Sequence, residues 1–158
     1  MIVKQAMKNI WTIRFVLLLS FVLFDFLTTL ASISDINQEG NLLAKAAMNA
    51  FGIHLGLALF SLYVSSFLLL IILSCRGLLP NQKNKLTFTL FVVLDFGFGW
   101  FIAGSHFVGG TSWFLNASPL LRQVLGFTVY FSLVLWFETK LYRKTSWLSA
   151  SKKRTVHC

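Results

Sequence analysis

The sequence predicts an all-α polytopic membrane protein, a single transmembrane domain over residues 1–158 built as a bundle of four helices. Of its 158 residues, 56% are hydrophobic and only 12% are charged, which is outside the usual balance of soluble domains. The apolar residues also form long runs, and a bilayer crossing takes about 20 such residues. With loops, this length holds about four crossings and leaves no room for a separate soluble domain.

The four helices are expected in order at about residues 13–33, 48–75, 86–108 and 120–142, followed by a basic cytoplasmic tail at 143–158. The first apolar run contains one charge, Asp25. The second run is long enough to tilt or to extend beyond the bilayer. A basic turn with Gly77 and Pro80 separates the second helix from the third, because both residues disfavour a continuing helix. The fourth helix follows Pro119 and runs into the basic tail.

Lysine and arginine are distributed unevenly between the two predicted sides of the membrane. Twelve lie in the N-terminal segment, in the second loop or from Lys140 onward, and only Lys45 and Arg122 lie on the opposite side. The positive-inside rule therefore predicts that both termini are cytoplasmic. Because the basic residues lie at segment ends, we interpret the net charge of +9 as a topology signal with contacts to lipid, and we expect no nucleic-acid partner.

Ionisable side chains inside the apolar runs indicate a candidate site. A charged residue at membrane depth costs about 2.5–3.5 kcal/mol on insertion scales and usually faces protein or water. His54 is expected level with Asp25, on a neighbouring helix, and Asp95 shares a helix face with His106. We therefore predict a polar cavity that opens to the outer side, with the following lining residues: Asp25, Thr28, Thr29, His54, Asp95, Ser105 and His106.

The chemistry of these side chains leaves several hypotheses open. As ligands of a divalent metal, the candidates are Asp25, His54, Asp95 and His106, since carboxylate and imidazole bind many such ions. As a proton relay, or as catalytic acid and base, the candidates are Asp25, His54 and Asp95. In the structural alternative, polar side chains tie helices together at about 0.6 kcal/mol per hydrogen bond. No HExxH, CxxC or P-loop motif selects a cofactor or an enzyme class.

Two further patterns concern helix packing. Glycines in the second and third helices predict close approach of neighbouring helices. Residues 21–26 and 91–96 match at four of six positions, including the aspartate. A duplicated helical hairpin would explain this match, and so would a chance similarity between two segments rich in phenylalanine.

The stretch from Asp25 to Thr29, Asp-Phe-Leu-Thr-Thr, followed by Glu39-Gly40-Asn41, resembles the signature of a family of small uncharacterised bacterial and archaeal membrane proteins. That family has Asp-x-x-[Ser/Thr]-Thr in its first helix and Glu-x-Asn-Pro just after it, and here Leu42 stands where the family has proline. The resemblance covers about residues 20–45. It implies a multi-pass protein of a prokaryotic plasma membrane, in which Asp25, Thr29, Glu39 and Asn41 act together at the outer end of the first helix.

Two functions are predicted. The first is a small accessory or binding subunit of a larger membrane assembly, with other membrane subunits or further copies of the chain as partners. This hypothesis is based on a chain that is almost wholly apolar helix and that carries 17 phenylalanines. The alternative is an autonomous intramembrane site, based on Asp25, His54 and Asp95, that serves a metal-dependent enzyme or a small transporter.

Overall fold

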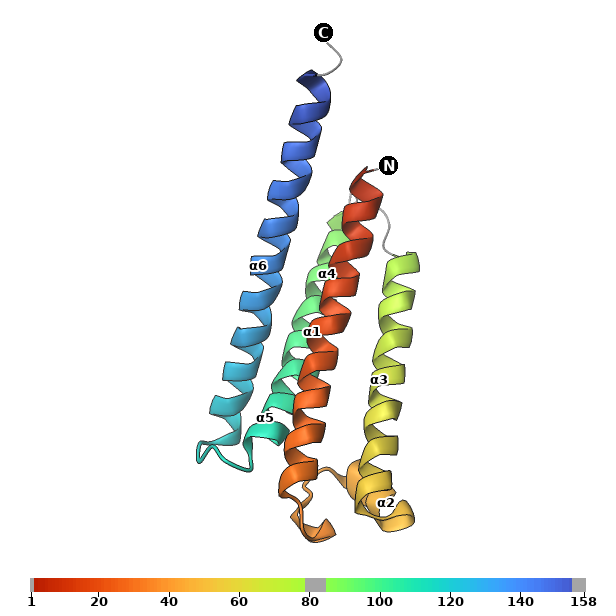
Figure 1. The fold of residues 1–158 in the computed structure, drawn as a ribbon, viewed down its shortest axis with the longest axis vertical. Helices are drawn as coiled ribbons and strands as arrows, with labels where there is room; N and C mark the ends of the chain where they lie inside the picture. Colours follow the sequence, from red (N-terminus) through yellow and green to blue (C-terminus); the bar gives the residue numbers. More distant parts are fainter. Residues whose placement is uncertain (1, 79–84, 155–158) are drawn as a thin grey trace.

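The computed structural model describes residues 2–78 and 85–154, with side chains described for 10–75 and 89–140 (Figure 1). This part of the chain is all-helical, which confirms the all-α part of the predicted fold class. Four helical segments are long and apolar enough to cross a membrane: Ile10–Ser32, Ile53–Cys75, Thr89–Thr111 and Pro119–Lys140. The elements in order are α1 (Ile2–Ser32), the 3-10 turn η1 (Ile36–Gln38), α2 (Leu42–Phe51), α3 (Ile53–Leu78), α4 (Lys85–Gly97), the π-helical segment η2 (Phe98–Gly104), α5 (Ser105–Thr111) and α6 (Pro119–Arg154).

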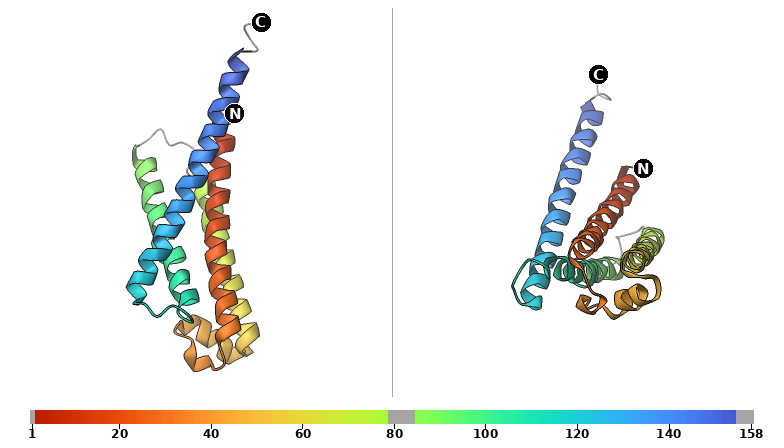
Figure 2. Two further views of the ribbon diagram at one scale, coloured as in Figure 1. Left: turned by 60° about the vertical axis from the view of Figure 1, so that its left-hand side comes forward. Right: turned by 60° about the horizontal axis from the view of Figure 1, so that its bottom comes forward.

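Helix α1 is the centre of the bundle. It packs against α3, η2, α5 and α6, while α3 also packs against α2, and α6 against η2 and α5. The N- and C-terminal ends lie together at one end of the molecule, and α2 and the connection between α5 and α6 lie at the other (Figures 1 and 2). The main core gathers along α1, where Leu18, Phe21 and Val22 are buried.

The predicted second helix, residues 48–75, is two helices with a sharp break at Gly52. Gly52 has a φ of 83°, a backbone conformation that glycine adopts without steric cost, and it ends α2. Helix α2 itself begins at Asn41, whose side chain accepts hydrogen bonds from the amides of Leu43 and Ala44. The connection expected at residues 34–46 is therefore partly helical. At Gly56 the backbone of α3 lies directly against that of Ala47, so α2 folds back tightly on α3.

The middle of the third apolar segment, η2, is a π-helix. A π-helical turn is uncommon and is frequently found at functional sites. Here the π-helical segment lies against α6, where a side chain at Gly99 would meet the rings of Tyr130 and Phe131. Helix α5 is equally close to α6, because a side chain at Gly126 of α6 would meet Phe107. The predicted close packing is thus observed at Gly56, Gly99 and Gly104, whereas Gly52 and Gly97 have no neighbouring atom within 4 Å of where a Cβ would lie.

The ends of the outer helices differ from the prediction. Helix α1 begins at Ile2, and α6 continues to Arg154, so the predicted basic tail is helical over most of its length. Residues 155–158 of that tail, and residues 79–84 of the predicted basic turn, lie outside the described residues. Many large apolar side chains on α3 and α6 are exposed, among them Leu62 and Leu70 at 63%. An apolar surface of this extent is typical of a protein that is surrounded by lipid or by partners.

Candidate functional site

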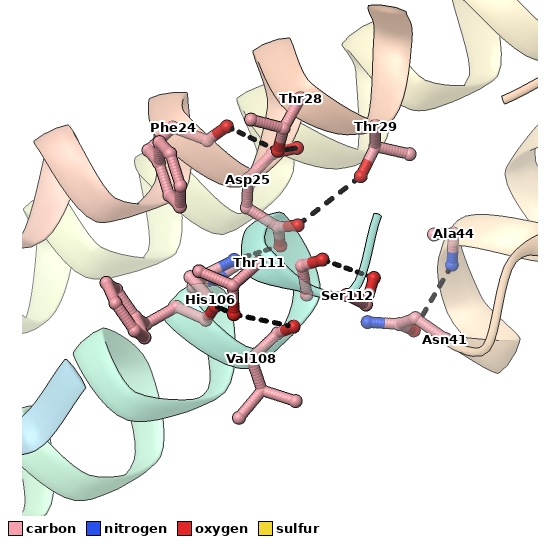
Figure 3. A network of polar contacts seen from close by, with 12 residues as sticks. Phe24, Asp25, Thr28, Thr29, Asn41, Ala44, His106, Val108, Thr111 and Ser112 are labelled. Atoms are coloured by element: carbon pink, nitrogen blue, oxygen red, sulfur yellow. Dashed lines mark hydrogen bonds and ion pairs between the residues drawn. The ribbon is translucent and has the colours of Figure 1, made fainter. Parts of the chain in front are cut away.

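The carboxylate of Asp25 in α1 is hydrogen-bonded to the imidazole of His106 in α5. Its Oδ2 lies 2.7 Å from His106 Nδ1, and the two side chains are 24% and 15% exposed. One turn further along α1, Thr29 donates a hydrogen bond to Asp25 Oδ1 at 3.4 Å. Thr29 in turn accepts one at 3.1 Å from the indole nitrogen of Trp113. Figure 3 shows these α1 side chains pointing toward α5, so the carboxylate is held by two helices.

Two glycines of α5 allow this close approach. The Gly109 backbone lies against the Asp25 carboxylate, and Gly110 lies against the Phe24 ring and the Thr28 hydroxyl group. Any side chain at these positions would enter space that α1 occupies. The pair of glycines Gly109-Gly110 therefore makes room for the contact between Asp25 and His106.

We expect Gly109→Ala to break the pair between Asp25 and His106, because the new methyl group would collide with the Asp25 carboxylate. The measurement is NMR of histidine side chains labelled with ¹⁵N, in lipid nanodiscs. The His106 resonance should move in Gly109→Ala and in Asp25→Asn by a similar amount. Gly97→Ala is the matched control, because its Cβ meets no other atom within 4 Å. An unchanged His106 resonance in Gly109→Ala would contradict the contact.

The pair lies at the wall of a small polar cavity between α1, α2, α3 and α5. Its volume is about 30 Å³, which is enough for a water molecule or a small ion. Glu39 also lines the cavity, and its carboxylate accepts a hydrogen bond of 2.7 Å from the backbone amide of Asn41. The lining residues are Val22, Asp25, Phe26, Thr29, Glu39, Asn41, Ala44, Leu57, Phe60, Ser61 and His106.

The predicted pairing of Asp25 with His54 is wrong. His54 is exposed, and it is absent from the cavity lining. The physical reason is the break at Gly52, since α3 starts only at Ile53 and His54 lies in its first turn. Among the other predicted residues, Asp25, Thr29 and His106 do line the cavity. Ser105 is exposed, and Thr28 donates its hydroxyl hydrogen to the Phe24 carbonyl at 2.8 Å.

Asp95 belongs to a second, separate cluster. Its carboxylate receives two hydrogen bonds from Arg14, from Nε at 2.8 Å and from Nη2 at 2.9 Å, and one from the Tyr130 hydroxyl at 3.0 Å. Arg14 Nη1 also lies 2.6 Å from Glu138 Oε1. The Arg14 side chain is only 2% exposed, and its guanidinium carbon lies 4.8 Å from the centre of the Phe91 ring. This cluster ties together α1, α4 and α6.

Arg14, Tyr130 and Glu138 were not predicted as part of any site. Arg14 was interpreted as one of the basic residues that set the topology, but it is buried in the core. A signal was present in the sequence, because Arg14 and Asp25 are separated by the same eleven residues as Asp95 and His106. Both hydrogen-bonded pairs consequently join residues 81 apart in sequence. The first and third apolar segments run parallel, so a residue of the first lies beside the residue 81 positions later in the third. The equal spacing within each segment therefore brings both pairs of side chains together.

The predicted metal ligands do not converge on one point. Asp25 contacts His106, Asp95 lies in the Arg14 cluster, and His54 is exposed. Across the described side chains, no group of three or more His, Cys, Asp or Glu residues is arranged to hold a metal ion. Asp25, Glu39 and His106 line one water-sized space without forming such a group.

Comparison of the chain with protein-family models, with curated proteins and with solved structures gave no match. The fold and the site therefore define the class of protein by themselves. In its described part, the chain is an all-helical protein with four helices able to cross a membrane, a polar cavity beside Asp25 and a buried ionic cluster around Arg14.

Proposed function

We propose that this chain is a multi-pass membrane protein that binds a small cation in the cavity beside Asp25. The observation that supports this most strongly is that Asp25, Glu39 and His106 all line one space of about 30 Å³. Two carboxylates and one imidazole favour a positively charged ligand. Asn41, Thr29 and Ser61, which have oxygen-bearing side chains, also line the space.

The membrane topology is part of the proposal. The four apolar segments would cross the plasma membrane of a prokaryotic cell, with both termini in the cytoplasm. The cavity would then lie toward the outer face, because α1 runs from the terminal end of the bundle to the end where α2 lies. Asp25, Thr29, Glu39 and Asn41, which the family resemblance implies act together, all line this one cavity. That shared lining supports the proposed site.

The test is thermal unfolding of the protein in phosphatidylcholine nanodiscs, with sodium, ammonium or magnesium chloride compared with choline chloride at equal ionic strength. Choline is too large for the cavity and serves as the reference. A cation present at ten times its Kd should stabilise the fold by about 1.4 kcal/mol, and so raise Tm by about 3–5 °C. This stabilisation should be lost in Asp25→Asn and in Glu39→Gln.

The matched control is Asp35→Asn. Asp35 is an exposed acid in the same connection as Glu39, and asparagine keeps its capping role for η1. Asp35→Asn should therefore retain the full cation-dependent rise in Tm. Equal Tm values in all four salts, or equal losses in Asp35→Asn and Glu39→Gln, would contradict the proposed cation site.

We also propose that the chain works as a subunit of a larger membrane assembly, in which the cavity is its binding site. The observation that favours this is the one-sided packing of α3, which contacts α1 and α2 and leaves Leu62, Phe67 and Leu70 exposed. Native mass spectrometry of the protein, extracted gently from its own membrane, tests this. Additional polypeptides or copies beyond the 17.9 kDa chain would support an assembly, and a bare monomer would contradict it.

A further inference from the structure

A second hollow lies next to the polar cavity, between α2 and α3. It has a volume of about 280 Å³ and is lined by Leu43 and Ala47 of α2 and by Leu59, Phe60 and Tyr63 of α3. Each helix contributes residues four apart, so one face of α2 meets one face of α3. Leu43 and Tyr63 are 67% and 64% exposed, which leaves the hollow open toward the surroundings of the bundle. We call this hollow the α2–α3 groove.

Phe60 is a wall of both spaces. Its side chain lines the α2–α3 groove and also the polar cavity that contains Asp25, Glu39 and His106. One aromatic side chain therefore lies between an apolar space that opens outward and a polar space inside the bundle. Because Phe60 is the residue that the two linings share, a ligand that occupied both spaces would pass beside it.

The two spaces differ in size and chemistry in a complementary way. A cavity of 150 Å³ lined by apolar side chains is already large enough to hold benzene, so the groove has room for an alkyl chain of several carbons. The polar cavity has only the volume of a water molecule or an ammonium group, and it presents two carboxylates. A ligand that matches both spaces has one apolar tail and a small cationic head.

We infer that the ligand of the site is a single-chain amphiphile with an ammonium head, whose alkyl chain lies in the α2–α3 groove and whose head passes Phe60 to reach Asp25 and Glu39. This inference rests on the proposed cation site and names its ligand class. A fatty acid fits less well, because its carboxylate would meet two like charges. The ligand would enter sideways from the lipid, on the side where α3 is exposed.

The experiment uses two photoreactive probes in phosphatidylcholine nanodiscs that contain the full chain. One probe is dodecylamine with a diazirine in its alkyl chain, and the other is the matching dodecanoic acid. Mass spectrometry of peptides then locates the labelled residues. The amine should label the segment from Leu42 to Tyr63 more strongly than the acid does. Excess unlabelled dodecylamine should compete with it, and dodecanoate should not.

Variants on α2 separate the groove from general lipid contact. Ala47→Trp fills the α2–α3 groove. It should lower amine labelling about tenfold, because the affinity for the amine falls by about that factor. Ala50→Trp is the matched control, because Ala50 is exposed on the same helix and does not line the groove. Its labelling should equal that of the unchanged chain. Glu39→Gln should reduce labelling by the amine and should not reduce labelling by the acid.

The outcomes distinguish this inference from the proposed cation site. Equal labelling by both probes, or labelling that survives Ala47→Trp, would overturn the amphiphile as ligand. A cross-linked dimer that disappears in Ala47→Trp would overturn it too, because a second copy of the chain would then occupy the groove. In each of these cases the rise in Tm with a small cation would still measure the cation site separately, and Ala47→Trp should retain that rise.

Discussion

Replacing Arg14 with methionine is expected to lower the free energy of unfolding by about 3–5 kcal/mol, the largest effect of any single change considered for this chain. The physical reason is that Asp95, which is 7% exposed, would keep its charge in an apolar core without its main partner. Glu138 would lose the same partner. The measurement is reversible unfolding by sodium dodecyl sulfate in mixed lipid micelles.

A double-mutant cycle shows whether the loss comes from the ion pair itself. Arg14→Met combined with Asp95→Leu should be less destabilising than the sum of the two single changes. The reason is that the double variant removes both charges of the pair, so neither is left buried alone. Lys140→Met is the control, since Lys140 is an exposed cation that stacks over Trp136 at 4.9 Å and has no acidic partner described. It should change the free energy of unfolding by less than about 1 kcal/mol. Strict additivity of Arg14→Met and Asp95→Leu would show that the two residues do not interact.

The second large effect is expected for Gly126→Ala, which should destabilise the fold by about 1–3 kcal/mol. The new methyl group would meet Phe107 at its Cβ, an atom fixed to the backbone, so α5 and α6 would have to separate. The same unfolding measurement applies. A reduction in stability would show that α6 is held by backbone proximity as well as by the Arg14 cluster.

Gly97→Ala gives the opposite expectation and is the matched control for Gly126→Ala. No atom lies within 4 Å of its added Cβ, so only the helix propensity changes, which favours alanine by about 1 kcal/mol. The variant should unfold at an equal or higher concentration of sodium dodecyl sulfate. If Gly126→Ala and Gly97→Ala shifted stability in the same direction, the described contact between α5 and α6 would be contradicted.

The fold class and several site residues could be predicted from the sequence because they depend on local composition. An apolar run of some 20 residues is helical wherever it lies, and a carboxylate such as Asp25 within it stands out at once. Thr29 follows from the spacing of a helix turn. Glu39 and Asn41 came from the resemblance to a family signature, and they reach the same cavity as Asp25.

The partners of the charged residues depended on tertiary structure. Whether Asp25 meets His54 or His106 is decided by the 83° φ at Gly52 and by the absence of a side chain at Gly109. The match between residues 21–26 and 91–96 had drawn attention to two equivalent aspartates. In the structure, however, Asp25 pairs with His106, whereas Asp95 pairs with Arg14. The two segments thus differ in their contacts despite their similar sequences.

The sequence by itself determined that the chain forms long apolar helices and that a few of them carry charges in their interiors. Both properties follow from neighbouring residues, since helix periodicity and hydrophobicity are local. Only the tertiary structure decided which charges meet, that Arg14 is a core residue, and that Phe60 separates the polar cavity from an apolar groove. Those facts depend on helix register and on glycine contacts between residues far apart in the chain, which no local pattern specifies.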